Sequence, residues 1–154
     1  MHLGHVIEAD ARWRLFAFCP DEDPSAADSA IATLCRFLSD DPASPVRRVA
    51  RPGEDVDAFI DLRAILQQRP GDLAFETLPA LLKPEKGRHG LIDYEKIFCA
   101  DPREGDIFDM RGIDRARGAL VVVRPDQYVA HVLPIVAHAE LAAFFSNFTQ
   151  PPAR

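Results

Sequence analysis

The stretch from Gly118 to Ile135, reading GALVVVRPDQYVAHVLPI, constrains the fold more than any other part of the chain. Its first run, Ala119–Val123, is unbroken, apolar and rich in β-branched residues, which is typical of a strand buried on both faces. Residues 128–133 form a second such run, and the Arg124-Pro125-Asp126-Gln127 segment between the two has the proline and aspartate of a type I turn. We therefore expect an antiparallel hairpin at the centre of a sheet.

An amphipathic helix is predicted directly after this hairpin, because apolar residues recur there at helical spacing. Its apolar face consists of Ala137, Leu141, Phe144, Phe145 and Phe148.

The first half of the chain predicts a strand, a helix and a second strand. Residues 12–19 begin in alternation and become continuously apolar, which suits a strand in the middle of a sheet. Asp23-Pro24 predicts the helix start, since aspartate caps free backbone N–H groups and proline fits the first helical position. The apolar stripe of that helix is Ala27, Ile31, Leu34 and Leu38. Residues 56–62 predict a strand parallel to the first, with a right-handed crossover, and residues 63–66 fit either strand or helix.

The remaining segments are less regular. Residues 3–8 predict an extra strand that extends the sheet edge, and residues 42–55 a surface connection. Residues 73–82 and 91–98 show helical spacing, interrupted in the first case by Pro79. The segment 83–118 as a whole is a long irregular excursion, and connections of that length often form functional or interface segments.

These elements, in this order, predict an α/β protein of the thioredoxin-like sandwich type. It would have a mixed central sheet with a C-terminal β-hairpin and flanking helices, in a single domain over residues 1–154.

Charge and composition narrow the classes of partner. Asp and Glu number 24 against 18 Lys and Arg, a formal charge of −6, which disfavours nucleic acid. No apolar run reaches the roughly 20 residues of a membrane helix. The three cysteines form no CxxC pair, which favours a reduced, cytoplasmic protein.

No residue pattern indicates a catalytic, cofactor or metal site. Cys19-Pro20 stands where a thioredoxin-like fold places its redox motif, but the acidic residues that follow would raise the thiol pKa. Cys19 and Cys35 are therefore interpreted as buried structural thiols. His2 and His5 are three apart and would point to opposite faces of a strand, and the dispersed glycines contain no GxGxxG.

Several sequence words, in order along nearly the whole chain, resemble the C-terminal domain of the flavin-dependent aromatic hydroxylases of the phenol 2-monooxygenase type. The hairpin word RGALVVVRPDQYVAHV is the specific one, and its turn residues Arg124, Pro125, Asp126, Gln127 and Tyr128 form a structural family motif. The weaker words are Leu3-Gly4-His5, Arg12-Trp13-Arg14, Ile60-Asp61-Leu62-Arg63 and Gly90-Leu91-Ile92-Asp93-Tyr94-Glu95.

This resemblance implies a thioredoxin-like domain without thioredoxin chemistry, placed after FAD-binding and substrate-binding domains and associated with subunit contact. FAD and NADPH belong to the parent family, whose motifs for them lie upstream. No catalytic residue is therefore assigned, and the isolated chain is expected to be inactive.

The leading hypothesis is a non-catalytic accessory and dimerisation domain, with a second copy or the upstream flavin domain as its partner. The excursion 83–118 is the expected interface, because some of its apolar residues exceed what the sheet needs. The candidate interface residues are Leu91, Tyr94, Phe98, Phe108 and Met110. The alternatives are a thiol redox protein on the same fold and a small-ligand binding module using this excursion.

Overall fold

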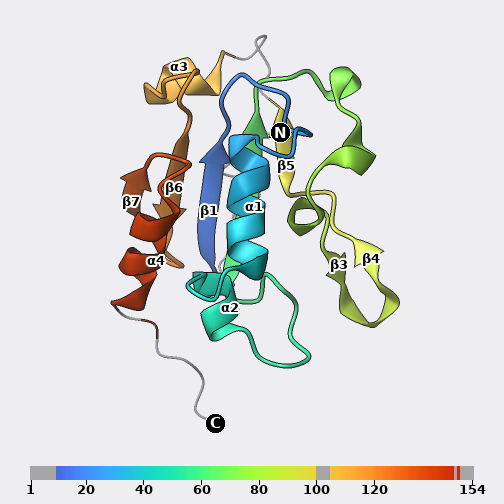
Figure 1. Cartoon of the computed structure of the whole chain (residues 1–154), viewed down its shortest axis with the longest axis vertical. Coiled ribbons are helices and arrows are strands. Elements are labelled where there is room, and N and C mark those ends of the chain that lie inside the picture. Colours follow the sequence, from blue (N-terminus) through green and yellow to red (C-terminus); the bar gives the residue numbers. More distant parts are fainter. Residues whose placement is uncertain (1–9, 100–104, 148, 150–154) are drawn as a thin grey trace.

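A five-stranded mixed sheet forms the centre of the molecule, in the strand order β5-β2-β1-β6-β7 (Figure 1). The computed structural model describes residues 10–99, 105–147 and 149. The strands are β1 (Trp13–Phe18), β2 (Ile60–Leu66), β5 (Ile97–Cys99), β6 (Ala119–Val123) and β7 (Val129–Leu133). β1 pairs in parallel with β2 and antiparallel with β6, and β2 pairs in parallel with β5. The mixed sheet and the parallel strand–helix–strand unit are thus as predicted.

The β6–β7 hairpin is present, but its position was predicted wrongly. β1, and not the hairpin, is central, and β7 lies at the sheet edge. β6 is largely buried, whereas Val129 and Val132 of β7 are exposed. The two apolar runs look alike in sequence, so their composition did not distinguish an inner strand from an edge strand.

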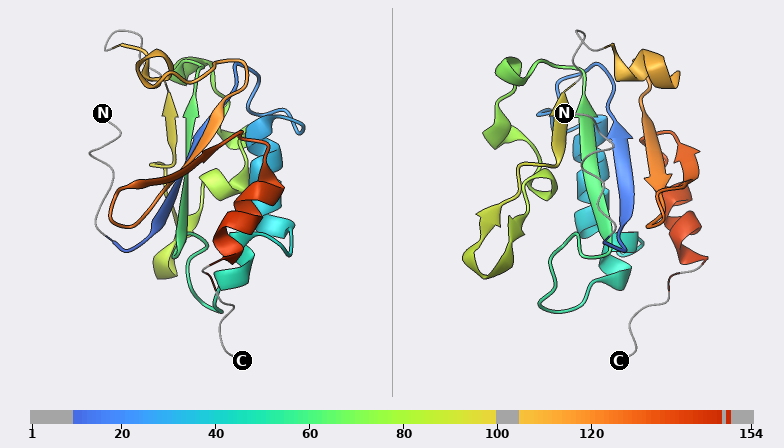
Figure 2. Two further views of the ribbon diagram at one scale, coloured as in Figure 1. Left: turned by 90° about the vertical axis from the view of Figure 1, so that its left-hand side faces the viewer. Right: turned by 180° about the vertical axis from the view of Figure 1, so that it is seen from behind.

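Helices α1 (Ala30–Asp40), α2 (Pro45–Val49) and α4 (His138–Ser146) pack on one face of the sheet (Figure 2). The buried side chains of that core alternate along the strands, with Leu15 and Ala17 on β1 and Leu120 and Val122 on β6. The opposite face is apolar only in part. Phe16, Phe18 and Ile65 pack there against Phe108 of α3 (Ile107–Arg111).

The first helix begins later than Asp23-Pro24 predicts. The Asp23 carboxylate accepts hydrogen bonds from the Ser25 backbone N–H and hydroxyl, which holds a turn instead of a helix. The Ser29 hydroxyl caps α1 by accepting from the Ala32 N–H, and Glu22 accepts from the Ala30 N–H. Ala27 therefore lies outside the helix and is exposed, while the other three stripe residues are buried.

The connection over residues 42–55 holds structure that the sequence interpretation missed. Residues 42–55 contain α2, capped by the Ser44 hydroxyl. The next strand begins at Ile60 and continues to Leu66, which settles residues 63–66 as strand.

The predicted helical segments at 73–82 and 91–98 are both wrong. The first consists of short 3₁₀ turns: η3 (Phe75–Thr77) and η4 (Ala80–Leu82), after η2 (Pro70–Asp72). In the second, Leu91–Ile92 is β4, which pairs with β3 (Glu85–Lys86) across η5 (Gly87–His89). Ile97–Cys99 is β5, so the excursion 83–118 supplies one strand of the main sheet.

The C-terminal helix is present over a shorter span than its predicted face implies. Leu141 and Phe145 are buried, Phe144 packs against the core from a half-buried position, and Phe148 lies outside the described residues. The predicted strand at residues 3–8 also lies outside them. No helix in the described part of the chain is long and apolar enough to cross a membrane.

Candidate interface

The five predicted interface residues do not form one surface. Leu91 and Tyr94 are exposed at the β3–β4 ribbon, and Met110 is exposed on α3. Phe98 lies half-buried against the second core, and Phe108 is fully buried in it. Phe108 packs edge-on against Phe18, with ring centroids 5.5 Å apart, so it presents no surface to a partner.

The family-motif residues form the turn of the β6–β7 hairpin. The Gln127 N–H donates to the Arg124 carbonyl at 2.9 Å, and the Arg124 N–H donates to the Tyr128 carbonyl at 2.9 Å. Gln127 has a φ of 69°, which places it in the left-handed region after the Pro125-Asp126 turn. Arg124 and Asp126 form an ion pair of 2.6 Å across the turn. The predicted turn is thus confirmed, and these hydrogen bonds and this ion pair are made within it.

An exposed apolar surface that the sequence interpretation missed lies on and beside β7. It consists of Tyr128, Val129, Val132 and Val136, each more than half exposed. Val132 pairs with Val121 and Val129 with Val123, so both valines lie on the sheet face opposite α4. No such signal was present in the sequence, because strict alternation would put Val129 and Val132 on opposite faces, and the irregular pairing at Val122 and Val123 brings them to the same one.

His131 fixes the other face of β7 against α4. Its Nε2 lies 2.9 Å from a carboxylate oxygen of Glu140, and its ring stacks on Phe144 with centroids 5.3 Å apart. Val122 pairs with His131 and belongs to the core beneath α4. The hairpin is therefore held on its α4 side and open on the other.

A buried group of charged residues occupies the part of the second sheet face that is not apolar. Asp61 on β2 is fully buried and pairs with Lys96 and, at 2.9 Å, with Arg63. Lys96 also contacts Asp57 at 2.6 Å, and Lys86 pairs with Asp57 as well. These contacts join the segment before β2, β2 itself and the residue before β5.

The charges of this group hold one another in the ionised form. Burial would raise the pKa of Asp57, but hydrogen bonds from Lys86 and Lys96 outweigh it and keep that pKa below its ordinary value. Burial would lower the pKa of Lys96, but Asp61 and Asp57 raise it. The arrangement is that of a structural ion-pair network. Among the described residues no group of His, Cys, Asp and Glu could hold a metal ion.

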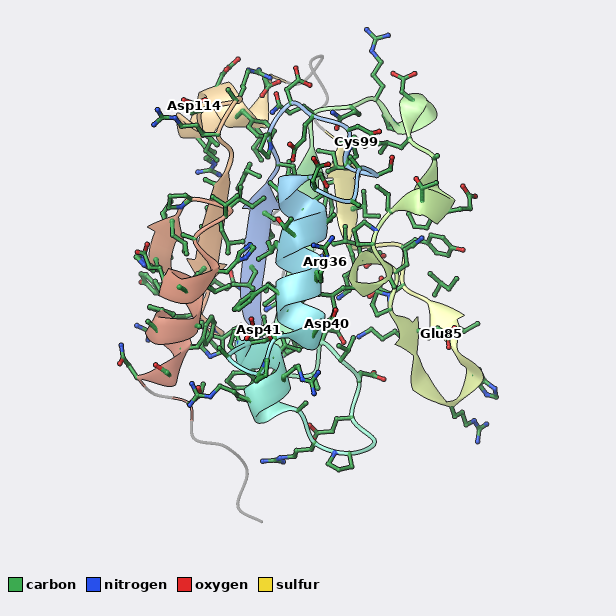
Figure 3. All side chains as sticks on the ribbon, viewed as in Figure 1. Arg36, Asp40, Asp41, Glu85, Cys99 and Asp114 are labelled. Atoms are coloured by element: carbon green, nitrogen blue, oxygen red, sulfur yellow. The ribbon has the colours of Figure 1, made fainter. Side chains whose placement is uncertain are left out.

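The cysteines are free thiols, and two of them lie in the core. Burial raises the pKa of Cys35 to about 12, and burial with the nearby Cys35 and Glu22 raises the pKa of Cys19 further. Cys99, on β5, is half-buried, and burial raises its pKa as well (Figure 3). A redox thiol needs the opposite surroundings, namely exposure and a lowered pKa.

The family model for the phenol hydroxylase C-terminal dimerisation domain matches residues 1–153. The chain belongs to this family.

Two curated relatives of the dimerisation domain are much longer proteins. The chain is 55% identical over 150 residues to a 3-hydroxybenzoate 4-monooxygenase of Comamonas testosteroni, covering 96% of the chain and 24% of the relative. It is 32% identical over 154 residues to the FAD-dependent monooxygenase terD of Aspergillus terreus, covering 97% of the chain and 25% of that relative. The dimerisation domain thus spans about a quarter of either relative's length.

The residues of the dimerisation domain do not fit FAD. A flavin pyrophosphate needs a glycine-rich turn between a strand and a helix, where backbone N–H groups face the phosphates. The connection after β1 instead reads Cys19-Pro20-Asp21-Glu22-Asp23, and its acidic side chains would repel a phosphate.

One pocket of about 170 Å³ lies beside α2, outside the excursion where a small-ligand site was predicted. Ligand sites are commonly about 300–1,000 Å³, so this pocket is small for one. Its lining includes Val46, Val49, Val56, Phe59 and Ile60.

Proposed function

We propose that this chain is the non-catalytic association domain at the C-terminal end of an FAD-dependent aromatic-ring hydroxylase, and that it assembles as a two-fold homodimer. The single observation that carries the proposal is the match of a dimerisation-domain family over residues 1–153. The two relatives are monooxygenases of which the chain covers only a quarter, so the FAD and NADPH chemistry is assigned to the rest of such a protein.

The proposed fold type is a thioredoxin-like sandwich forming a single domain. The β1–α1–β2 unit is parallel, and the antiparallel β6–β7 hairpin and α4 follow it. The four strands β2-β1-β6-β7 lie side by side with α1 and α4 on one face, which is the arrangement that such a sandwich requires. A cytoplasmic location is part of the proposal and is supported by the three free cysteines.

The thiol redox alternative is disfavoured by the surroundings of Cys19. Its thiol is almost fully buried, donates weakly to the Ala17 carbonyl at 3.4 Å and has a raised pKa. Cys35 lies in the same core and would make a poor resolving partner, because it is buried with a raised pKa of its own.

Sedimentation equilibrium of the purified 154-residue chain tests the association. A dimer is expected, with about twice the 17.1 kDa mass of the chain. A single species at the chain mass, from micromolar to near-millimolar concentration, would contradict self-association and favour the flavin domain as the partner.

Absorbance between 350 and 500 nm tests the proposal that FAD is bound by the rest of such a protein and not by this chain. The purified chain is expected to be colourless and to leave phenols unchanged in the presence of NADPH, because its sequence contains no glycine-rich phosphate-binding motif. Flavin retained in equal amount to the chain through purification would contradict the assignment.

A further inference from the structure

We propose that β7 is the strand through which two copies of this chain meet, edge against edge, so that the two five-stranded sheets join into one. The proposal deepens the proposed function and rests on it, because a dimerisation domain needs one self-complementary surface for a second copy.

The two edge strands of the sheet, β5 and β7, differ in how readily they could pair with a strand of a second copy. The β5 edge is three residues long, and Lys96, which precedes it directly, is buried in the ion-pair network. The β7 edge is five residues long and contains no charged side chain and no proline. Charge, proline and short length are the usual means by which proteins prevent edge strands from pairing. β7 does carry one such device, a bulge opposite Val122 and Val123 near the turn, and the pairs from Val122–His131 to Leu120–Leu133 are regular.

The charge distribution favours a second copy as the occupant. Between Asp126 and Arg154 the only Asp, Glu, Lys or Arg is Glu140, in a chain that otherwise alternates charged and apolar segments. A two-fold contact brings residues near the axis close to their own copies, so a charged strand there would repel itself. With a net charge of −6 per chain, an uncharged side is where two copies can approach without that repulsion.

The uncharged segments also lie together in space. β7 and α4 occupy the same side of the molecule, and the view onto that side shows both elements at the surface (Figures 1 and 2). Glu85 is on the β3–β4 ribbon at the opposite side (Figure 3), and the charged residues next to β7, Arg124 and Asp126, pair with each other in the hairpin turn. Glu140 is engaged by His131, which faces α4 and not the open side of β7.

The apolar side chains beside the edge match what the contact needs. Val129 and Val132 stand on the open face of β7, and Tyr128 and Val136 flank the strand. Antiparallel pairing of β7 with its copy would place Val132 next to the partner's strand and cover these side chains. The two-fold symmetry follows from this geometry, since identical edge strands that pair antiparallel are related by such an axis.

Charge substitutions at two exposed residues test the assignment. In Val132→Glu, each copy carries the new charge to the axis, and the dimer dissociation constant is expected to rise about a hundred-fold or more. Leu91→Glu is the matched control on the β3–β4 ribbon, where the residue is similarly exposed, and is expected to change the constant less than about threefold. Both substitutions lie at exposed positions, so near-ultraviolet circular dichroism should match the original chain.

Pairing of opposite charges separates a self-contact from a folding defect. Mixing Val132→Glu with Val132→Lys is expected to restore dimers, each with one copy of either variant, as counted by native mass spectrometry. If Val132→Glu folds poorly, amide hydrogen exchange of the original chain tests whether β7 lies in the dimer interface. The amides of Val129–Leu133 should exchange more slowly above the dissociation constant than below it.

The outcomes separate the two proposals. An original chain that stays monomeric would contradict the proposed self-association and this assignment with it. An original chain that dimerises, while folded Val132→Glu dimerises equally well, would contradict only the role of β7. So would unchanged exchange in β7, or dissociation caused by Leu91→Glu instead.

Discussion

At the scale of single residues, Gly118 is the position where one methyl group would disturb the sheet most directly. It has a φ of 63°, and a Cβ there would lie 2.3 Å from the Phe18 carbonyl oxygen. Gly118→Ala is therefore expected to reduce the free energy of unfolding by about 3–4 kcal/mol, from backbone strain and overpacking together. Gly112 has the same φ, but no atom lies within 4 Å of its added Cβ. Gly112→Ala should cost only about 1–2 kcal/mol in urea unfolding, and equal losses would contradict the close approach.

The thiols give a second prediction at this scale. Cys99 is expected to react first with a thiol reagent at pH 8, because it is half-buried, whereas Cys19 and Cys35 lie in the core with strongly raised pKa values. Mass spectrometry after timed labelling measures the order. Modification of Cys19 as fast as Cys99 would revive the redox alternative.

At the scale of elements, β6 is the strand of the hairpin that is largely buried, whereas burial was predicted for both strands. Val122 is fully buried under α4, so Val122→Asp should cost about 4 kcal/mol or more, comparable with the stability of a whole domain. Val56→Asp, in the exposed loop before β2, is the matched control and should change stability by less than about 0.5 kcal/mol. Thermal and urea unfolding measure both, and a Val122→Asp variant with unchanged stability would contradict the position of β6.

The ion-pair network joins β2 to its flanking segments, and Lys96 is a buried cation that contacts both Asp57 and Asp61. Lys96→Met should cost about 3–5 kcal/mol, because it removes the buried cation that Asp61 and Asp57 share. Lys86→Met removes a partly exposed partner of Asp57 and should cost about 1 kcal/mol or less. Comparable losses of stability in the two variants would show that burial of an ion pair does not determine how much it stabilises the fold.

The elements that sequence alone predicted are those whose signal is local. β1, β6 and the Arg124–Gln127 turn were found from continuous apolar runs and from proline at its preferred turn position. β5 was mistaken for helix because its partner, β2, lies some thirty residues earlier, and pairing over that distance overrides local spacing. The exposed side of β7 was missed for a related reason. An apolar strand has the same sequence pattern at the edge of a sheet as inside it. β7 is exposed because no strand pairs with its outer edge in the described sheet.

At the scale of the whole molecule, the network sets a pH window for stability. The pKa of Asp57 is lowered in the folded chain, so its contribution is present above its unfolded value of 3.8 and is lost as the pH falls below it. The pKa of Lys96 is raised, so its contribution is present below 10.5 and is lost as the pH rises through the folded value. Urea unfolding across pH 3–11 should show a plateau between these limits. The difference in stability between the original chain and Lys96→Met should narrow at the acid end, where Asp57 takes a proton and loses its attraction to Lys96.

The central position of β1 has a consequence for the order in which the chain can fold. Arg14 pairs with Val123, near the other end of the sequence, so the middle of the sheet closes only after β6 has been synthesised. The β6–β7 hairpin needs no such long loop and can form within microseconds. Contacts this distant in sequence slow folding, since the entropy of closing the loop is lost before the pairing is gained. During synthesis β2 can pair with one edge of β1, but the other edge of β1 stays unpaired until the hairpin that completes the sheet has been made.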